Sequence, residues 1–214
     1  MIGNIALIID TNSNYSDVWA PCFGRLERYA KGIKKYAFTD TPSGLKQIEE
    51  KYIIYTSEDY ILFNQVHVSA IDKISIVLDG TDYSFCKFIK GPEQTTHYQN
   101  DLYIIDQSDQ NFFAQQASLW NTRDFQKVFE EAPPGNTRMQ HEPGGSAICR
   151  KLGLKGLQHY SGTQRRGMHH HDSEIFPCIA TAVVKGLWNM SEYPSEMSDV
   201  VREYNIDLNL RGWR

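Results

Sequence analysis

The sequence predicts a layered α/β fold with a parallel sheet in its N-terminal half. Apolar runs of strand length alternate with stretches of helical periodicity over residues 5–56, the order typical of strands joined by crossover helices. No repeat or low-complexity linker divides the 214 residues, which favours a single domain. With 41% hydrophobic and 22% charged residues, the chain has the composition of a globular protein with a well-filled core.

The N-terminal elements follow from hydrophobic spacing. The run from Ile5 to Ile9 is apolar throughout, as in a strand buried on both faces. Apolar residues recur at helical spacing from Phe23 to Ile33, and Pro21 suits the first turn of that helix. The predicted order is strand, helix, strand, helical turn and strand, over residues 5–9, 21–36, 36–39, 45–50 and 51–56.

The C-terminal elements are predicted from periodicity and from capping residues. Strands are expected over residues 84–90 and 102–106, and helices over residues 65–79, 121–132, 144–153 and 191–207. Asn121 or Thr122 caps the second of these helices. Gly145 or Ser146 opens the third, and Gly153 closes it.

Charge and motif content exclude several classes of protein. A net charge of −4 provides no basic field for nucleic acid. The four cysteines form no CxxC pair, so we expect free thiols in a reducing compartment. The first apolar run is too short for a signal peptide or a transmembrane segment, which predicts a cytoplasmic protein. The sequence contains no GxGxxG, Walker A or GxSxG motif.

Two adjacent acids follow the strand predicted over residues 51–56. Glu58 and Asp59 either mark the exit of this strand into a solvated turn or present carboxylates to a cation. The second interpretation follows from the tendency of open α/β sheets to bind ligands at the carboxyl ends of their strands.

Three further segments carry polar groups that packing does not require. In FFAQQASLW, Gln115 and Gln116 either contact a ligand or lie at the surface. In RMQHEPGGS, Glu142 precedes a predicted helix start. Its carboxylate either interacts favourably with the helix dipole or acts as a base. In RRGMHHHDSEIFP, three consecutive histidines cannot all point the same way, and Arg165 and Arg166 either grip phosphate or form a solvated face.

Five segments in this order resemble small single-domain glycosyltransferases of the GT-A type, as found in bacterial polysaccharide loci and in a chlorella virus. They are NIALIIDTNSNYSDVW, YIIYTSEDYILF, FFAQQASLWNTRDF, RMQHEPGGSAICRKLGLKG and HHHDSEIFPCIATAVVKGLWN. The resemblance implies a GT-A-like (Rossmann-like) fold, with a mixed, mostly parallel sheet flanked by helices, in one domain over residues 1–214. It implies a nucleotide-sugar-binding part over residues 1–63 and an acceptor-binding and catalytic part over residues 64–214.

The resemblance also implies a divalent metal, Mn or Mg, that bridges the donor diphosphate. Asp59 matches the last acid of the family's DxD-like motif, which is the usual metal ligand, and Glu58 fills the middle position. Ser57 stands where the family has its first Asp. His170, with His169 and His171 beside it, matches a segment that supplies a third ligand.

Glu142 matches the last acid of a W-E-x-E-like segment, which deprotonates the acceptor hydroxyl, while Gln140 replaces the earlier acid. A strand and part of a helix that enclose the nucleotide in such enzymes are missing after residue 39. Asp10, Thr11 and Asp40 are expected to contact the nucleoside. Arg165 and Arg166 are expected to contact the diphosphate. The sugar or acceptor is expected to contact Gln115, Gln116 and Trp120. Tyr15 or Trp19 stacks on the base, with a core role as the alternative for Trp19.

The expected activity is inverting, metal-assisted transfer of a sugar from a nucleotide-sugar donor to a hydroxyl of a glycan or lipid-linked acceptor, in surface polysaccharide synthesis. A lipid-linked acceptor implies peripheral membrane association without a transmembrane segment. Two alternatives use the same residues. One is a non-catalytic relative that binds a nucleotide or glycan, and the other is a metal-dependent phosphohydrolase or nucleotidyltransferase.

Overall fold

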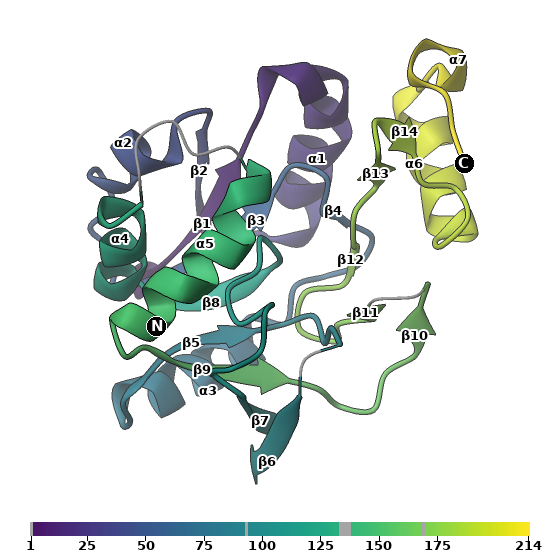
Figure 1. The fold of residues 1–214 in the computed structure, drawn as a ribbon. Helices are drawn as coiled ribbons and strands as arrows, with labels where there is room; N and C mark the ends of the chain where they lie inside the picture. The colour runs from purple at the N-terminus through teal and green to yellow at the C-terminus, as the bar shows by residue number, and fades with distance from the viewer. Residues whose placement is uncertain (1, 93, 133–137, 168–169) are drawn as a thin grey trace.

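An eight-stranded mixed sheet lies at the centre of the computed structural model, which describes residues 2–92, 94–132, 138–167 and 170–214 (Figure 1). Residues 2 and 138–141 are described by their backbone alone. The strands across the sheet are β2 (Lys34–Phe38), β1 (Ile5–Asp10), β3 (Tyr52–Ser57), β8 (Ser118–Asn121), β5 (Tyr83–Lys87), β9 (Lys155–His159), β7 (Leu102–Ile105) and β6 (Thr95–Gln99).

The pairings show that only part of the sheet is parallel. β1 pairs in parallel with β2 and β3, and β5 pairs in parallel with β9. The pairs β3–β8, β5–β8, β7–β9 and β6–β7 are antiparallel. The predicted α/β fold with a parallel N-terminal half is therefore confirmed. The sheet is mixed as expected, but the expectation that it is mostly parallel is wrong, since its described part has four antiparallel and three parallel pairings.

Helices cover both faces of the sheet (Figure 1). They are α1 (Ser16–Tyr29), α2 (Thr41–Leu45), α3 (Val68–Asp79), α4 (Thr122–Glu130), α5 (Arg138–Lys151), α6 (Pro194–Tyr204) and α7 (Leu208–Arg211), with 3₁₀ turns η1 (Ile2–Asn4) and η2 (Ser13–Tyr15). Alternate residues of β1 point to opposite faces. Leu7 packs in a core with residues of α1, α3 and α6, and Ile8 packs in a second core with residues of α2, α4 and α5. All six residues of β1 are buried, as the continuous apolar run predicts.

Two N-terminal helices lie earlier in the chain than predicted. α1 begins five residues before Pro21 and ends at Tyr29 instead of continuing to residue 36. Gly32 adopts a positive φ of 78°, and the chain turns there into β2. The short helix α2 occupies residues 41–45 instead of 45–50, because Asp40 precedes a Pro suited to the first turn.

Three strands of the eight-stranded sheet, β6, β8 and β9, were not predicted, and neither were the short strands outside it. β8 and β9 lie inside the sheet, but their sequences, SLWN and KGLQH, mix polar and apolar residues without alternation. Long-range pairing therefore decides their structure. The predicted Asn121 cap is confirmed, since its side chain accepts hydrogen bonds from the Arg123 and Asp124 N–H groups.

The last third of the chain adds short two-stranded pairs beside the sheet. They are β4 (Ile61–Leu62) with β12 (Cys178–Ile179), β10 (Arg165–Arg166) with β11 (His170–His171), and β13 (Val183–Val184) with β14 (Leu187–Trp188). β4 carries the apolar run that follows the acidic pair, so β12 brings the C-terminal segment next to these acids. Among the described residues, no helix combines the length and apolar character needed to cross a membrane.

Candidate functional site

The acidic pair lies where β3 ends, next to the end of β1. Asp10 and Ser57 are partners in the register of these strands, and the Glu58 N–H donates to the Asp10 carbonyl oxygen at 3.3 Å. Glu58 is 0% exposed, and its Oε1 accepts a hydrogen bond from the Asn12 N–H at 3.0 Å. Its carboxylate therefore joins two strand ends and points away from solvent.

Asp59 differs from Glu58 in its exposure. It is only partly buried, and its Oδ1 accepts a 2.6 Å hydrogen bond from the Ser57 hydroxyl. Ser57, which replaces an acid of the expected motif, thus holds one oxygen of Asp59. Of the two acids, Asp59 is the one that the structure leaves accessible to a ligand.

The residues expected to contact a nucleoside gather at the carboxyl ends of β1 and β2. Asp10 is 8% exposed and accepts hydrogen bonds from Thr41 Oγ1 at 2.7 Å and from the Tyr55 hydroxyl at 3.2 Å. Thr11 is also buried, and its N–H donates to the Phe38 carbonyl oxygen. Asp40 is exposed and accepts a 2.6 Å hydrogen bond from Ser43 Oγ.

Glu142 lies inside a helix rather than before one. α5 begins at Arg138, so the carboxylate is on the fifth residue, still near the positive end of the helix dipole. The Glu142 side chain is partly buried, and its Oε1 accepts a 2.9 Å hydrogen bond from the Gln115 N–H. Two segments predicted to contribute to one site, residues 112–120 and 138–146, are therefore in direct contact.

The segment before Gln115 is held on both sides. Ser146 Oγ accepts a hydrogen bond from the Phe113 N–H at 2.9 Å and donates one to the Gln110 carbonyl oxygen at 3.0 Å. From the other side, the buried Lys87 ammonium donates to the Asn111 carbonyl oxygen. These contacts fix the position of the amide that binds Glu142.

Tyr60 links Asp59 with Glu142. Burial raises the pKa of the Tyr60 hydroxyl, and the negative charges of Asp59 and Glu142 raise it further. Both predicted functional carboxylates therefore lie within electrostatic range of one phenol. The sequence analysis did not predict a role for Tyr60, although its position directly after the acidic pair could have indicated one.

The glutamines and the tryptophan predicted on the sugar side have different environments. Gln115 is partly buried beside Glu142, and Gln116 is 8% exposed. Trp120 belongs to β8 and is 1% exposed, with its ring stacked 4.1 Å from that of Phe85. The structure therefore places Trp120 in the second core, away from any ligand, because β8 is a central strand.

Arg166 is engaged in an ion-pair network in the 165–196 region. It donates to Asp172 Oδ2 at 3.0 Å and to Glu196 Oε1 at 2.8 Å, and it lies over the ring of Tyr193. Arg165, its neighbour on the hairpin, is exposed. Of the two arginines, Arg165 is therefore the one with an accessible guanidinium.

The histidines point in different directions, as the sequence predicts. His170 Nε2 lies 3.4 Å from Glu192 Oε2, and its ring stacks against Tyr193. His171 Nδ1 lies 3.1 Å from the Thr163 carbonyl oxygen. His169 lies outside the described residues.

Cys178 lies within electrostatic range of both this network and the acidic pair. Burial raises the pKa of the Cys178 thiol, and the charges of Asp172 and Asp59 raise it further. Asp172, which binds Arg166, and Asp59 therefore both lie within electrostatic range of β12.

The fit of a divalent cation depends on how many ligands the protein must supply. Within the described ranges, no three His, Cys, Asp or Glu side chains are placed to hold a metal together. Glu58 is fully buried, whereas Asp59 is partly exposed. One accessible carboxylate suits Mg²⁺, which in nucleotide sites commonly takes one or two carboxylates and completes its shell with phosphate oxygens and water. The residues thus fit a substrate-bridged ion better than a cage made by the protein.

No model of a known protein family matches the chain, and no curated protein sequence matches it.

Proposed function

We propose that the protein is a GT-A-type glycosyltransferase that moves a sugar from a nucleotide-sugar donor to a hydroxyl of a glycan or lipid-linked acceptor. The observation that carries the proposal is that the carboxylates of Asp59 and Glu142 both lie within electrostatic range of the Tyr60 hydroxyl, although 82 residues lie between them along the chain. Their positions, after a sheet strand and near a helix start, agree with the roles that the sequence resemblance implies.

The donor is proposed to bind at the carboxyl ends of β1, β2 and β3. Asp40 is exposed to the nucleoside, while the buried Asp10 and Thr11 support this edge, Asp10 through Thr41 and Tyr55 and Thr11 through its N–H on the Phe38 carbonyl oxygen. Asp59 would hold the divalent cation, with His170 as the further ligand that the resemblance implies. The cation would neutralise charge on the leaving diphosphate. Arg165 is the arginine proposed to assist, because its side chain is exposed, whereas that of Arg166 is partly buried beside Asp172 and Glu196.

Glu142 is proposed to act as the general base. The Gln115 N–H holds Oε1, which orients the carboxylate so that Oε2 can accept the proton of the attacking hydroxyl. Glu142 lies on α5, whereas the donor is proposed to bind at the ends of β1, β2 and β3. The acceptor hydroxyl would therefore attack from the face opposite the diphosphate, and this attack would invert the anomeric centre. Gln115 lies next to this carboxylate and is the proposed contact to the sugar or acceptor.

One observation favours the non-catalytic alternative. Glu58 is fully buried, and Ser57 occupies the first position of the acidic motif, so a single accessible carboxylate remains at the end of β3. A protein with this arrangement could bind a nucleotide sugar without turning it over.

Two substitutions test the proposal, using a panel of nucleotide sugars with and without Mn²⁺. Calorimetry is expected to detect metal-dependent binding that Asp59→Ala weakens at least tenfold. Glu142→Gln is expected to keep donor affinity within about twofold and to reduce transfer by about 10²–10⁴-fold, the usual contribution of a general base. Release of nucleoside diphosphate measures transfer.

The matched controls are Asp101→Ala and Glu49→Gln, which change exposed acids outside the site. Both are expected to behave as the wild type. Donor binding that survives Asp59→Ala and metal removal would contradict the metal-bridged mechanism. Undiminished transfer by Glu142→Gln would contradict the base assignment, and donor binding without turnover in the wild type would support the non-catalytic alternative.

A further inference from the structure

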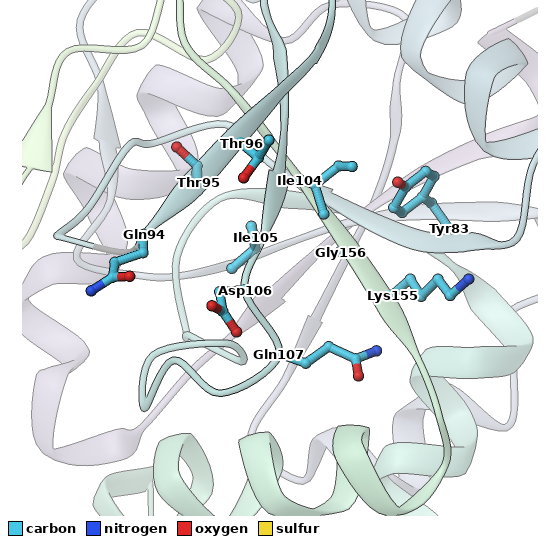
Figure 2. Close-up of a pocket in the computed structure, with 10 residues that line it drawn as sticks. All are labelled: Tyr83, Gln94, Thr95, Thr96, Ile104, Ile105, Asp106, Gln107, Lys155 and Gly156. Carbon is cyan, nitrogen blue, oxygen red and sulfur yellow. The ribbon is translucent and has the colours of Figure 1, made fainter.

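Two adjacent cavities lie beside the β6 and β7 strands. One of about 520 Å³ is lined by residues of β5, β6, β7 and β9 and of the adjoining loops, and a second of about 330 Å³ is lined largely by the 106–111 segment. Gln94 and Asp106 line both cavities, so the two are adjacent, and they are here called together the β6–β7 groove. In Figure 2, Gln94 and Thr95 lie on one side of the larger cavity, and Tyr83 and Lys155 lie on the other.

The β6–β7 groove runs from the amino ends of β5 and β9 toward the carboxyl end of β5. Tyr83 and Lys155 are the first residues of β5 and β9, so the larger cavity lies at the amino ends of these strands. The smaller cavity reaches Gln110 and Asn111. Asn111 is bound by Lys87, the last residue of β5, at the edge where β1 and β3 also end. The groove therefore leads to the segment whose Gln115 N–H binds Glu142.

The lining is polar, and the charged groups in it are two carboxylates and one paired lysine. Gln94 and Gln107 contribute amides, and Thr95 and Thr96 contribute hydroxyls. The Lys155 ammonium is paired with Asp82 Oδ2 at 2.5 Å, so the described residues of the lining offer no unpaired cation to an anionic ligand. The carboxylates of Asp106 and Asp109 further disfavour phosphate-rich or acidic ligands.

Several of the polar groups are held in place before a ligand binds. Gln107 Nε2 donates to the Leu154 carbonyl oxygen at 2.8 Å, which orients its amide. Asp106 Oδ1 accepts hydrogen bonds from the N–H and hydroxyl of Ser108, both at 2.8 Å. Oriented amides and carboxylates beside a tyrosine ring suit a chain of neutral hydroxyl-bearing rings, and the volume is in the usual range of ligand pockets, about 300–1,000 Å³.

We propose that the β6–β7 groove binds a neutral oligosaccharide, namely the part of the acceptor glycan that is remote from the reacting hydroxyl. The neutral, hydroxyl-rich character of the ligand is inferred from the lining of the groove. That this ligand is part of the acceptor rests on the proposed function. Contacts to a remote part of the acceptor would position its reacting end near Glu142.

Binding is tested on the full chain by amide NMR with neutral hexasaccharides of glucose, mannose, xylose and N-acetylglucosamine, and with anionic hexagalacturonate for comparison. At least one neutral glycan is expected to shift the amide signals of Thr95, Thr96 and Gln107, and hexagalacturonate is expected to leave them unchanged. Absence of shifts there with every neutral glycan, or stronger binding of the anionic one, overturns the proposal.

The matched variants are Gln94→Ala in the groove and Gln99→Ala on the same hairpin outside both cavities. Gln94→Ala removes a side-chain amide that has no hydrogen-bond partner among the residues the structure describes. It is expected to weaken glycan binding about tenfold, and Gln99→Ala to leave it unchanged. Equal affinity of the two variants overturns the proposal.

The outcome for the groove is separable from that for the proposed function. Glu142→Gln is expected to retain glycan binding, because Glu142 does not line either cavity. Glycan binding by a protein that transfers no sugar supports the groove and contradicts the transferase. Transfer to a neutral oligosaccharide with the same acceptor KM in wild type and Gln94→Ala supports the transferase and overturns the groove.

Discussion

At the scale of single residues, the acidic pair divides into a structural and an accessible carboxylate. Glu58 is fully buried, and its Oε1 accepts the Asn12 N–H just beyond the end of β1. Asp59, one residue later, is partly exposed and bound to Ser57. Because successive side chains leave a strand end in different directions, adjacent acids of similar chemistry acquire different roles.

Glu58→Ala is expected to lower the free energy of unfolding by about 1–3 kcal/mol, because it removes the acceptor of the Asn12 N–H near a buried strand end. Urea denaturation measures the change. Glu58→Gln keeps an acceptor oxygen and is expected to lose less. Glu49→Ala, at an exposed position, is expected to stay within about 0.5 kcal/mol of the wild type. A cost for Glu58→Ala no larger than for Glu49→Ala would contradict a structural role.

At the scale of elements, the position of α5 decides where Glu142 lies. The helix approaches the 110–116 segment closely, because Gly145 has no side chain: a Cβ there would lie 2.5 Å from Cδ1 of the buried Phe113. Ser146, the next residue, forms hydrogen bonds to the same segment. A glycine and a serine on one turn thus bring Glu142 to the Gln115 amide.

Gly145→Ala is therefore expected to destabilise the fold by about 1–3 kcal/mol through overpacking against Phe113. It is also expected to reduce transfer more than donor binding, because α5 carries the proposed base. Thermal unfolding and donor calorimetry measure the two effects. Gly80→Ala is the control, since the nearest atom to its Cβ would be a carbonyl oxygen at 3.6 Å. Equal stability of the two variants would contradict the tight contact.

At the scale of the whole molecule, the C-terminal segment returns to the N-terminal helix. Arg211 donates from Nε to Asp17 Oδ2 at 2.7 Å, across 194 residues of sequence, and its guanidinium lies over the ring of Tyr15. The chain end also pairs with the segment after β14, through hydrogen bonds between the backbones of Arg214 and of Trp188 and Met190. These contacts fix α7 and the last residues against the α/β body.

The Asp17–Arg211 pair predicts a pH-dependent contribution to stability. The hydrogen bond from Arg211 lowers the pKa of Asp17 below its ordinary value of 3.8. The contribution is therefore fully present above this value and is lost as the pH falls through the lowered pKa. Because the Asp17 side chain is 47% exposed, we expect at most about 1 kcal/mol.

Unfolding of the wild type and of Asp17→Asn in urea at pH 7 and at pH 2.5 measures this contribution. The gap between the two proteins is expected to narrow at the lower pH, and also in 1 M salt at pH 7 because salt screens exposed pairs. A gap that is the same under all three conditions would show that the pair does not contribute through its charge.

The strands that could be predicted are those with a continuous apolar pattern. β1 and β3 are buried along their whole length, so their hydrophobicity alone identifies them. β8 and β9 also lie inside the sheet, but their short polar-containing sequences acquire strand structure only by pairing with distant segments. The site divides in the same way. Asp59 and Glu142 were predicted separately, whereas Tyr60 and the burial of Trp120 were not.

The local pattern of residues was enough to predict the α/β class, the parallel N-terminal strands and the polar groups at their ends, because hydrophobic periodicity and strand-end chemistry are local properties. Only the tertiary structure decided that β8 enters the sheet antiparallel, that Glu58 turns inward while Asp59 remains accessible, and that Glu142 reaches Gln115. These outcomes depend on contacts between residues far apart in the chain, and local spacing does not encode such contacts.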